Sequence, residues 1–592
     1  MTTMEQSVTV GGHHRILMLG GALFRAGSNE GDDMFQALLD PVASNLALSA
    51  LVACIPLITF FIMLLGVKAK AHISAVVALA VAILVAIIGF KMPAGLALVS
   101  ATQGAAFGAF PIVYIICMAV WFYEVTVVSG RSEDLRKFFD QVGGGDIRIQ
   151  AMMIAFCFGG LLEALAGFGA PIAVTATMIL ALGVKPKKAA LAVLLANTAP
   201  VAYGAVATPI TTAGAMVAGG DPVVAAETAK HVAAIVGYQA PIFAMFVPFL
   251  LVIILDGKQG AKDCWLPAFV VGIFFAITQW WCSNHFAYEL TDVIASLVGM
   301  AACIIFMRFW KPKGVDGVRE RFGLPPMAES ETSDLTASRT FMALVPYLIV
   351  VVVFGVCKLG IPQILSATDI KIAWPVISGG TILSAAGKDP GTTFNLNLLS
   401  TPGTMLLVAG LITAVVYSLN NENGRYTATM GGAIKAIGTT FYRMRFSALT
   451  IVLVLSLAYV MNFSGQTISI GQLLSGSGPA FPVISPLLGW VGTAVTGSDT
   501  SANALFAGLQ YSAAMSNGAL ANVTPDLFLA ANTMGGVVGK MISPQSLAIA
   551  AVATQVKEAD IMKNVLPWSV AFLIGTCILV GLQSTVLTFI LP

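Results

Sequence analysis

Residues 151–183 read AMMIAFCFGGLLEALAGFGAPIAVTATMILALG, and this stretch decides the interpretation of the whole chain. It is apolar enough for a membrane interior, yet Glu163 lies inside it and a Gly-Ala-Pro breaker beginning at Gly169 interrupts it. Basic residues flank both ends, and Lys and Arg beside membrane segments mark the cytoplasmic side. Two complete spans need about 40 apolar residues, more than the stretch contains. It is therefore predicted to be a re-entrant hairpin, residues 151–184, with its tip at residues 167–171.

The composition is that of a polytopic membrane protein. Of 592 residues, 57% are hydrophobic and 10% are charged, whereas soluble domains carry about 25% charged residues. No basic patch with interleaved aromatic residues is present in the sequence, so nucleic acid is not expected as a partner. The eight cysteines have no spacing typical of zinc ligands or of a disulfide framework. No metal site or cofactor is expected.

The apolar runs and the basic residues between them predict an all-α fold with about 12 transmembrane helices and both termini outside. The predicted organisation is an N-terminal tail (1–41), a first membrane half (42–313), a cytoplasmic loop (314–340) and a second membrane half (341–592). Residues 92–110 are rich in Gly and Ala. This run is too weakly apolar for a span, so it is placed at the outer surface.

Interrupted segments recur in both halves. Residues 189–214 are predicted to be a broken span, because Asn197, Thr198 and two prolines lie inside it and Pro removes a backbone donor. Residues 468–492, with SGSGPAFP at their middle, are predicted to be a second hairpin that enters from outside, and residues 491–515 a second broken span. A hairpin and a broken span in each half, in opposite orientations, are typical of an inverted-repeat transporter whose substrate site lies near the midplane.

Two acidic residues are candidates for proton coupling. Glu163 is a carboxylate at membrane depth, where desolvation favours the protonated form and ionisable groups are functional by default. Alternatively, it is a buried, hydrogen-bonded Glu that holds the hairpin tip. Asp499 either caps the half-helix that starts near Thr500, an ordinary use of Asp, or carries a proton or pairs with a cation. The sequence leaves these alternatives open.

Polar groups at the breaks are candidates for binding an anion. Exposed N–H groups at half-helix N-termini attract negative charge, and hydroxyl and amide side chains supply further donors. The alternative is helix kinking and small-residue packing. Lys540 would bind a substrate carboxylate as a point charge, neutralise Asp499, or extend its ammonium to the membrane interface. The candidate substrate-binding residues are Gly169, Asn197, Thr198, Ser498, Thr500, Ser501, Asn503 and Lys540.

Three stretches resemble the bacterial L-lactate permease family: GGLLEALAGFGAPIA (159–173), TGSDTSANALFAGLQ (496–510) and NTMGGVVGKMISPQS (532–546). The resemblance covers nearly the whole chain from Asp40 onward. It implies an inner-membrane symporter that moves L-lactate, and often glycolate or D-lactate, with protons. The family is grouped with a broader ion transporter superfamily. Some members of that superfamily use two hairpins and two broken helices in a mobile domain and work as elevators.

The paired Ser-Asn-Thr breaks of that superfamily are similar to Ala-Asn-Thr at residues 196–198 and to Ser-Asp-Thr at residues 498–500. Asp499 stands where the pattern has Asn. This difference argues against sodium coordination by the second loop and favours a titratable role for Asp499.

These features predict a secondary active transporter for proton-coupled symport of L-lactate and related 2-hydroxymonocarboxylates, multi-pass in the bacterial inner (plasma) membrane. The substrate carboxylate is expected between the hairpin tips, with Glu163 or Asp499 carrying the proton. The expected partners are lactate, protons and membrane lipid, and a homodimer is left open. Alternatives are a sodium-coupled carrier and an uncoupled carrier or channel. An intramembrane enzyme is not expected, because no nucleophile is paired with a base.

Overall fold

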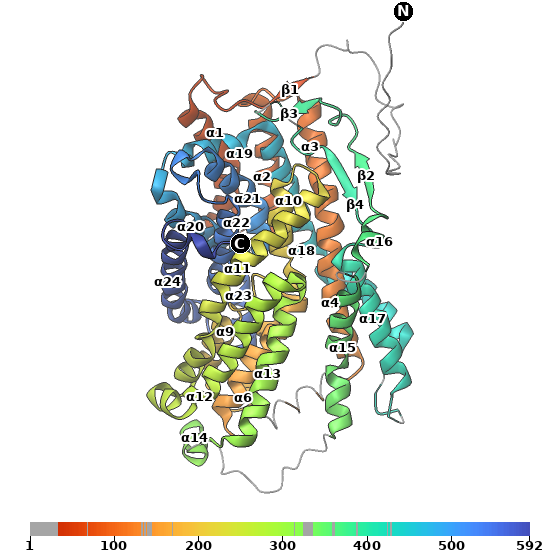
Figure 1. Cartoon of the computed structure of the whole chain (residues 1–592), viewed down its shortest axis with the longest axis vertical. Helices are drawn as coiled ribbons and strands as arrows, with labels where there is room; N and C mark the ends of the chain where they lie inside the picture. The colour runs from red at the N-terminus through yellow and green to blue at the C-terminus, as the bar shows by residue number, and fades with distance from the viewer. Residues whose placement is uncertain are drawn as a thin grey trace, which may run out of the picture.

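The computed structural model is a bundle of helices with two short two-stranded sheets at one end (Figure 1). Eleven helical segments of the described chain are long and apolar enough to cross a membrane, against about twelve expected from the sequence. They indicate a multi-pass membrane protein. The structure describes residues 34–592 except 68, 132–133, 135–137, 139–144, 168–169, 313, 324–335, 358–360, 386, 388, 423 and 427–428.

The first half contains residues 151–183, the stretch predicted to be a re-entrant hairpin. Three π-helical turns, η1 (Ile62–Gly66), η2 (Gly108–Val113) and η3 (Met153–Phe158), continue α1, α3 and α6, and a 3-10 turn, η4 (Tyr288–Leu290), leads into α13. The α-helices are α1 (Leu46–Phe61), α2 (Ala71–Ile88), α3 (Ala94–Phe107), α4 (Tyr114–Val128), α6 (Ile147–Met152), α7 (Gly159–Ala166), α8 (Ala170–Ala181), α9 (Pro186–Ala196), α10 (Gly204–Val217), α11 (Pro222–Ala244), α12 (Val247–His285), α13 (Thr291–Phe309) and α14 (Val315–Phe322).

The second half contains the remaining helices and most of the strands. Strand β1 (Phe35–Gln36) pairs parallel with β3 (Ile382–Leu383), and β2 (Ile370–Ala373) pairs antiparallel with β4 (Thr393–Leu396). The helices are α15 (Ala337–Gly355), α16 (Pro362–Ser366), α17 (Pro402–Leu419), α18 (Met430–Ser464), α19 (Gln466–Ser475), α20 (Phe481–Thr496), α21 (Asp499–Ser516), α22 (Asp526–Gly539), α23 (Pro544–Thr554) and α24 (Glu558–Gln583), with 3-10 turns η6 (Gly478–Ala480), η7 (Gly518–Leu520), η8 (Lys540–Ile542) and η9 (Thr588–Ile590).

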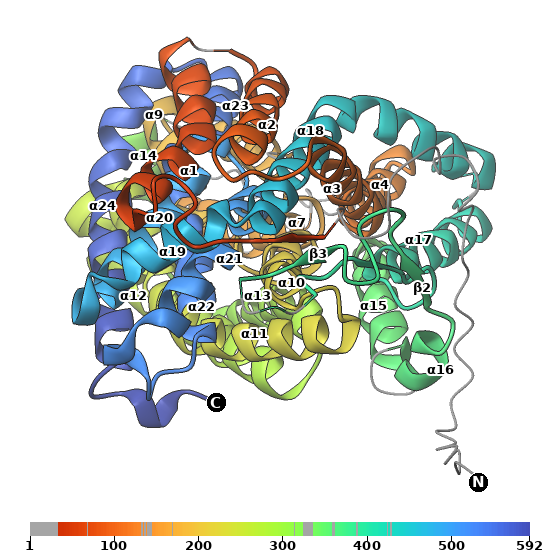
Figure 2. The same ribbon diagram turned by 90° about the horizontal axis from the view of Figure 1, so that it is seen from above.

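Local sequence signals set where several of these helices begin and end. Asp221 caps α11 by accepting a hydrogen bond from the Val223 amide at 2.8 Å, and Pro222 occupies the first turn. Gly465 ends α18 in the left-handed conformation, with φ +90°. In two perpendicular views, α3, α4, α15 and α17 gather on one side of the bundle and α20 and α24 on the opposite side (Figure 1, Figure 2).

The run at residues 92–110 forms α3 and most of η2, and α3 packs on α18. Non-helical backbone at Phe110 (φ −142°, ψ 125°) separates this run from the residues that lead into α4. Its placement at the outer membrane surface stays a prediction. A Cβ at Gly104 would lie 2.6 Å from the Leu455 carbonyl oxygen, and one at Gly108 would lie 2.8 Å from Val452 Cα. The glycines therefore allow two helix backbones to approach closely.

The first hairpin is visible as a reversal of the chain between α7 and α8. A Cβ at Gly159 would lie 3.4 Å from Thr175 Cγ2, although the two residues lie on opposite sides of the turn that follows Gly167. Gly169, part of the predicted tip, lies outside the described residues. That this hairpin enters and leaves a membrane on one side stays a prediction, as does the division of the chain into two halves around residues 314–340.

The reversal in the second half lies at Gly497, not within residues 468–492. The turn at SGSGPAFP joins helices that pack on different neighbours, α19 on α1 and α21, and α20 chiefly on α22. Gly497 has φ +75°, and a Cβ at Gly492 would lie 3.0 Å from Ala502 Cβ across the turn. Residues 491–515, expected to be a broken span, therefore form the junction of two packed helices. The sequence contains two Gly-rich turns, one at SGSGPAFP and one at Gly497. The helix packing shows that the chain reverses at the second of them.

The interrupted helix of the second half is α22–η8–α23, with its break at residues 540–543. It corresponds in chain order to α9 and α10, which are separated at residues 197–203. The contacts are reciprocal, because α8 packs on α23 and α21 packs on α10. Such reciprocity is expected of two repeats that enclose a site, and that the two halves are repeats stays a prediction. Their opposite orientations in a membrane stay a prediction.

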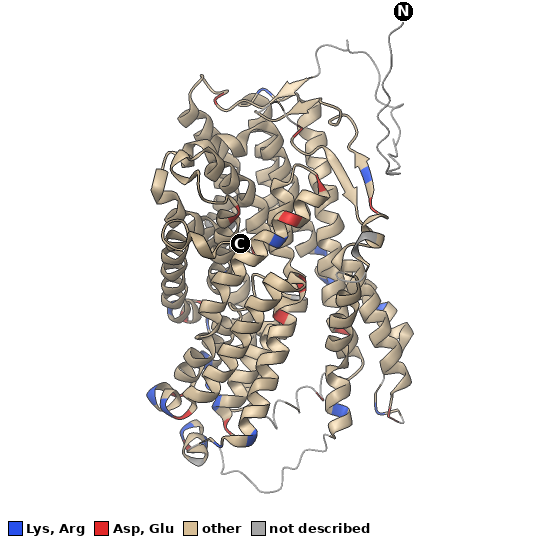
Figure 3. Ribbon diagram, viewed as in Figure 1, with Lys and Arg blue, Asp and Glu red and all other residues tan. Residues whose placement is uncertain are grey.

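Charged residues gather at the end of the bundle where α6, α12 and α14 lie (Figure 3). Arg148 is fully buried there and donates to carboxylate oxygens of Asp146, Asp256 and Asp263 at 2.8, 2.9 and 3.0 Å. Arg321 of α14 also donates to Asp256. This network connects the start of α6 to α12. It thereby fixes the first residues of the continuous α6–η3–α7 segment, which carries Glu163.

Candidate functional site

The break between α9 and α10 creates room for a buried carboxylate. Ala205, Val206 and Ala207 adopt left-handed φ values of 44°, 58° and 55°, a conformation that is costly for residues other than Gly and that clusters at functional sites. Gly204 precedes them, and a Cβ at this position would lie 3.2 Å from Glu163 Oε1. The interrupted backbone and the missing side chain together make space for the Glu163 carboxylate.

Glu163 lies at the centre of a cluster of polar groups from three segments, which we call the Glu163 cluster: Glu163, Asn197, Lys540 and the Gly167 carbonyl. Asn197 Nδ2 donates to Glu163 Oε2 at 2.8 Å. Lys540 Nζ forms an ion pair with Glu163 Oε1 and donates to the Gly167 carbonyl oxygen at 2.9 Å. Glu163 is 1% exposed and Lys540 8% exposed. The hairpin, the α9–α10 break and the α22–α23 break therefore meet at one buried ion pair.

This ion pair joins the two halves of the chain, because its partners are 377 positions apart. Each of the two buried charges is compensated by the other. Removing one partner of such a pair lowers the stability of the protein by about 3–5 kcal/mol. Lys540 is the cation of the cluster and has a compact ammonium that suits a carboxylate of either protein or ligand. Another carboxylate can therefore bind Lys540 only by displacing Glu163 from this ion pair.

A second buried carboxylate belongs to a different cluster, the Asp499 cluster, formed by Asp499, Thr493, Asn503, Asn532 and Thr533. Asp499 Oδ1 accepts from Asn503 Nδ2 at 3.2 Å and from Thr493 Oγ1 at 3.4 Å. Asn503 Oδ1 in turn accepts from Asn532 Nδ2 at 3.0 Å and from Thr533 Oγ1 at 3.1 Å. Within the described part of the chain, Asp499 Oδ2 has no hydrogen-bond partner.

The segment α22–η8 connects the two clusters. A Cβ at Gly536 would collide with Asp499 Oδ1, so α22 passes directly against the second carboxylate. One turn later, Lys540 reaches Glu163, and its charge also acts on Asp499 through space. One ammonium therefore influences two buried carboxylates, one by direct contact and one at longer range.

The structure assigns distinct positions to the other residues predicted from the sequence. Ser498, not Asp499, caps α21, because its Oγ accepts from the Ser501 amide at 3.2 Å. Thr198 Oγ1 donates to the Leu195 carbonyl at 2.6 Å, and Thr500 is buried in the first turn of α21. The buried Lys540 does not extend to an interface.

Asp292 was missed by the sequence analysis. It is fully buried in the first turn of α13, and Gln279 Nε2 donates to its Oδ1 at 2.8 Å. Acidic residues are ordinary in the first turn of a helix, so the sequence alone gives little reason to select it. Among residues with described positions, no group of three or more His, Cys, Asp and Glu side chains is placed to hold a metal ion.

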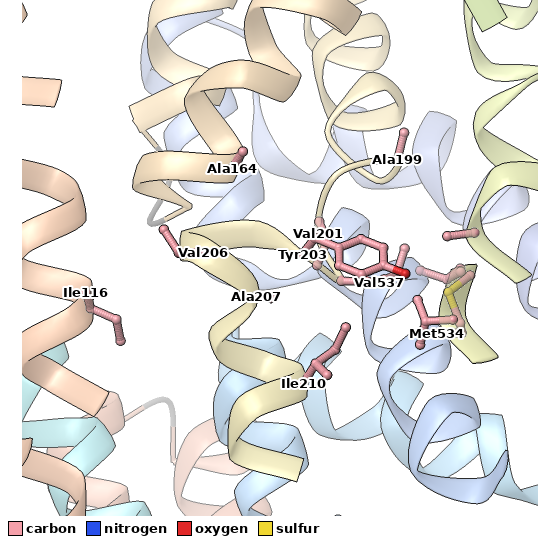
Figure 4. Close-up of a cluster of buried hydrophobic side chains, with 14 of the residues drawn as sticks. Ile116, Ala164, Ala199, Val201, Tyr203, Val206, Ala207, Ile210, Met534 and Val537 are labelled. Atoms are coloured by element: carbon pink, nitrogen blue, oxygen red, sulfur yellow. The ribbon is translucent and has the colours of Figure 1, made fainter. Parts of the chain in front are cut away.

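An apolar wall lies around the α9–α10 break (Figure 4). Val201 and Tyr203 of the first half lie beside the residues Met534 and Val537 of α22, and all four are buried. Val206 lies on the other side of the break, near Ala164. Tyr203 satisfies its hydroxyl by donating to the Ala233 carbonyl at 2.8 Å. Such a wall lowers the local dielectric constant, which strengthens each charge interaction of the neighbouring clusters.

The chain matches the family model described as L-lactate permease over residues 49–587. It is 36% identical to the L-lactate permease of Bacillus subtilis (strain 168), covering 93% of this chain and 99% of that protein. It is 35% identical to the glycolate permease GlcA of Escherichia coli (strain K12), covering 92% of this chain and 97% of that protein. The L-lactate permease of the same strain is 35% identical over 95% of this chain and 100% of that protein.

Among solved structures, the chain is similar to the Alcanivorax borkumensis YdaH transporter, with a TM-score of 0.41 and 14% identity, over 82% of this chain and 87% of that chain. The sequence relatives are named as permeases, which are transporters and not enzymes. The family model covers nearly the full length, and each of these sequence relatives exceeds 30% identity over more than nine-tenths of its length. The chain belongs to the L-lactate permease family.

Proposed function

We propose that this chain carries L-lactate and related 2-hydroxymonocarboxylates, such as glycolate and D-lactate, across the bacterial inner membrane in symport with protons. The observation that carries the proposal is the buried Lys540–Glu163 ion pair at the meeting point of the two interrupted helices and the first hairpin. The names of the relatives support the substrate class. The two hairpins α7–α8 and α20–α21 are proposed to be re-entrant around this site.

Competition for one cation provides the coupling. The substrate carboxylate approaches Lys540 and replaces Glu163 as its partner. Glu163, still buried and now without a cation, takes up a proton, because an uncompensated carboxylate in a low-dielectric site is far more costly than a neutral acid. Substrate and proton therefore favour each other's binding, and by thermodynamic reciprocity each raises the affinity for the other.

The charge of the loaded site favours movement across the membrane. The empty site holds Lys540 and Glu163 as a neutral pair, and the loaded site holds Lys540 and the substrate anion as a neutral pair beside a protonated Glu163. Either state avoids a net charge at bilayer depth, which costs several kcal/mol. A substrate anion without its proton leaves one negative charge in excess, so transport without the proton is disfavoured.

The polar groups beside the ion pair suit the rest of the substrate. Asn197 loses its acceptor when Glu163 is protonated on Oε2, and its amide is then available to a 2-hydroxyl or carboxylate oxygen. The first turn of α21 at Thr500 offers a backbone N–H group of a helix N-terminus, since the Ser501 amide is already capped by Ser498. A small hydroxy acid therefore meets one ammonium, one amide and one helix end.

Reconstitution in proteoliposomes tests the proposal. With the outside acidic and no sodium present, labelled L-lactate is expected to accumulate above its equilibrium level, and dissipating the pH gradient is expected to abolish the accumulation. Accumulation that ignores the pH gradient and follows a sodium gradient would overturn proton coupling. Equilibration without accumulation in either gradient would identify an uncoupled carrier or channel.

A further inference from the structure

Helices α7 and α13 run antiparallel, in a register defined by two close contacts of glycines. A Cβ at Gly299 would lie 3.8 Å from Cys157 Sγ, and a Cβ at Gly160 would lie 2.7 Å from Ser296 Oγ. Moving three residues forward along the η3–α7 segment, from Cys157 to Gly160, thus corresponds to moving three residues back along α13, from Gly299 to Ser296. The glycines bring the two backbones close enough for short side chains to meet.

The next step of this register places Glu163 beside Asp292. Moving three residues forward from Gly160 reaches Glu163, and three residues back from Ser296 reaches position 293, next to Asp292. The charges of Glu163 and Asp292 interact through space, as expected from this register. Among the described residues, Tyr203 of the α9–α10 break and Cys282 of α12 also interact with Asp292 through space.

Asp292 is a buried acid with an unused oxygen. Its Oδ1 is held by Gln279, whose Nε2 also lies 3.3 Å from the Ala199 carbonyl in the α9–α10 break. Its Oδ2 and the hydroxyl of Ser296, one turn later, have no hydrogen-bond partner in the described part of the molecule. Unlike Glu163, Asp292 forms no ion pair with a described side chain. Two unpartnered polar atoms on one helix face are where a proton or a bridging water is accommodated.

A cavity of about 640 Å³ reaches the start of α13. Its lining includes Thr211 of α10, Tyr288 and Glu289 of η4, and Glu227 of α11. Glu289 precedes Asp292 by three residues, so the two carboxyl groups lie on the same face of the turn. The chain thus presents three acids in spatial order, from the cavity wall to the buried ion pair.

We propose that Glu289, Asp292 and Glu163 form a proton relay between the cavity and the Glu163 cluster. The proposal rests on the proposed proton coupling. A hydronium ion in the cavity protonates Glu289 and leaves as water, Glu289 passes the proton to Asp292, and Asp292 passes it to Glu163. At each transfer one O–H bond breaks and one forms, and the donor returns to its carboxylate. Chains of acidic residues serve as such proton relays in pumps and transporters.

Asp292→Asn tests the relay, because Asn keeps the size and the oxygen that accepts from Gln279 but cannot carry a proton. In proteoliposomes at equal pH, exchange of external for internal L-lactate is expected to match the wild type, since exchange needs no net proton transfer. The initial rate of accumulation driven by a pH gradient is expected to fall at least about tenfold. A residue with only a structural role would lower both activities together.

Glu227→Gln is the matched control, because Glu227 lines the same cavity from α11 but is not one of the three acids of the proposed relay. It is expected to behave as the wild type in both assays. Glu289→Gln is expected to slow gradient-driven accumulation and to leave exchange intact.

Unchanged accumulation in Asp292→Asn would overturn the relay. If Asp292→Asn loses both activities, Asp292→Glu decides. Recovery of gradient-driven accumulation supports the relay because the titratable group is restored, and failure to recover assigns Asp292 to helix packing and overturns it. Absence of pH-driven accumulation in the wild type would overturn the proposed function itself, which separates the two failures.

Discussion

The Glu163 cluster and the Asp499 cluster hold their carboxylates in opposite ways. Glu163 is held by a cation, with Lys540 on one oxygen and Asn197 on the other. Asp499 is held only by neutral donors, Asn503 and Thr493, and one of its oxygens has no partner among the described groups. Both are buried and both lie against the same segment, α22–η8.

The difference separates two ways of neutralising a buried acid. A carboxylate with a cation stays ionised until something else takes the cation, so its protonation depends on the substrate. A carboxylate with neutral donors is most stable as the protonated acid whether or not substrate is present. We therefore expect Glu163 to respond to substrate and Asp499 to stay protonated throughout, and the following variants test this contrast from the largest expected effect to the smallest.

Lys540→Met is expected to have the largest effect. It leaves the Glu163 charge buried without its partner, so the free energy of unfolding should fall by about 3–5 kcal/mol and transport should be lost. The double variant Lys540→Met/Glu163→Gln removes both charges and should unfold at a higher temperature than Lys540→Met alone. Thermal unfolding of the purified proteins measures both, and a single variant as stable as the wild type would show that the ion pair is not a closed, buried contact.

Glu163→Gln is expected to uncouple transport while the protein stays folded. Gln keeps an oxygen and a donor near Lys540 and Asn197 but cannot carry a proton. Gradient-driven accumulation of L-lactate in proteoliposomes should fall by about 100-fold or more, within the range of a lost proton-transfer group, and exchange at equal pH should persist. Wild-type accumulation in this variant would remove Glu163 from the coupling mechanism.

Asn197→Ala should have an intermediate effect on the same cluster. It removes the 2.8 Å hydrogen bond to Glu163 Oε2, and a hydrogen bond to a charged group contributes about 1.5–3 kcal/mol. The apparent affinity for L-lactate should fall roughly tenfold, because the proposed amide contact with substrate is lost too. Thr198→Ala next to it serves as control, since the Thr198 hydroxyl donates to the Leu195 carbonyl and not to Glu163. Equal losses in the two variants would argue for a general distortion of the break.

Asp499→Asn should have the smallest effect of the four. The substitution keeps the oxygen that accepts from Asn503 and Thr493 and replaces a proton-bearing oxygen by an amide. We expect near-normal expression and accumulation, with at most a few-fold change in the affinity for L-lactate, because a protonated carboxyl and an amide are both neutral. Complete loss of accumulation with retained exchange would move the coupling role from Glu163 to Asp499.

The side chains of the Glu163 cluster are among the residues selected from the sequence, but their pairing could not be predicted. Glu163, Asn197 and Lys540 each interrupt an apolar run, and polar residues at membrane depth are costly enough to be conspicuous. The sequence left three alternatives for Lys540, which were Asp499, a substrate carboxylate and the membrane interface, whereas the structure pairs Lys540 with Glu163 across 377 positions. The distance between two helix breaks depends on how the two halves pack together, and it cannot be predicted from the local sequence around each break.

Parts of the fold were hidden for similar physical reasons. Gly104 and Gly108 suggested a weak helix when counted by hydropathy, but they are contact points for α18. SGSGPAFP and the turn at Gly497 are both rich in turn-forming residues, and only the packing of α20 on α21 and α22 shows where the chain reverses. Asp292 was concealed because its position, the first turn of a helix, is ordinary for an acidic residue.

The most direct test of the competition between substrate and Glu163 for Lys540 is proton uptake on binding. Purified wild-type protein in weakly buffered detergent solution with a pH indicator is mixed with L-lactate, and the protons taken up are compared with the ligand bound. We predict uptake of about one proton per bound L-lactate in the wild type, and none in Glu163→Gln, because binding and protonation are linked. Binding of L-lactate by the wild type with no change in bound protons would contradict this account.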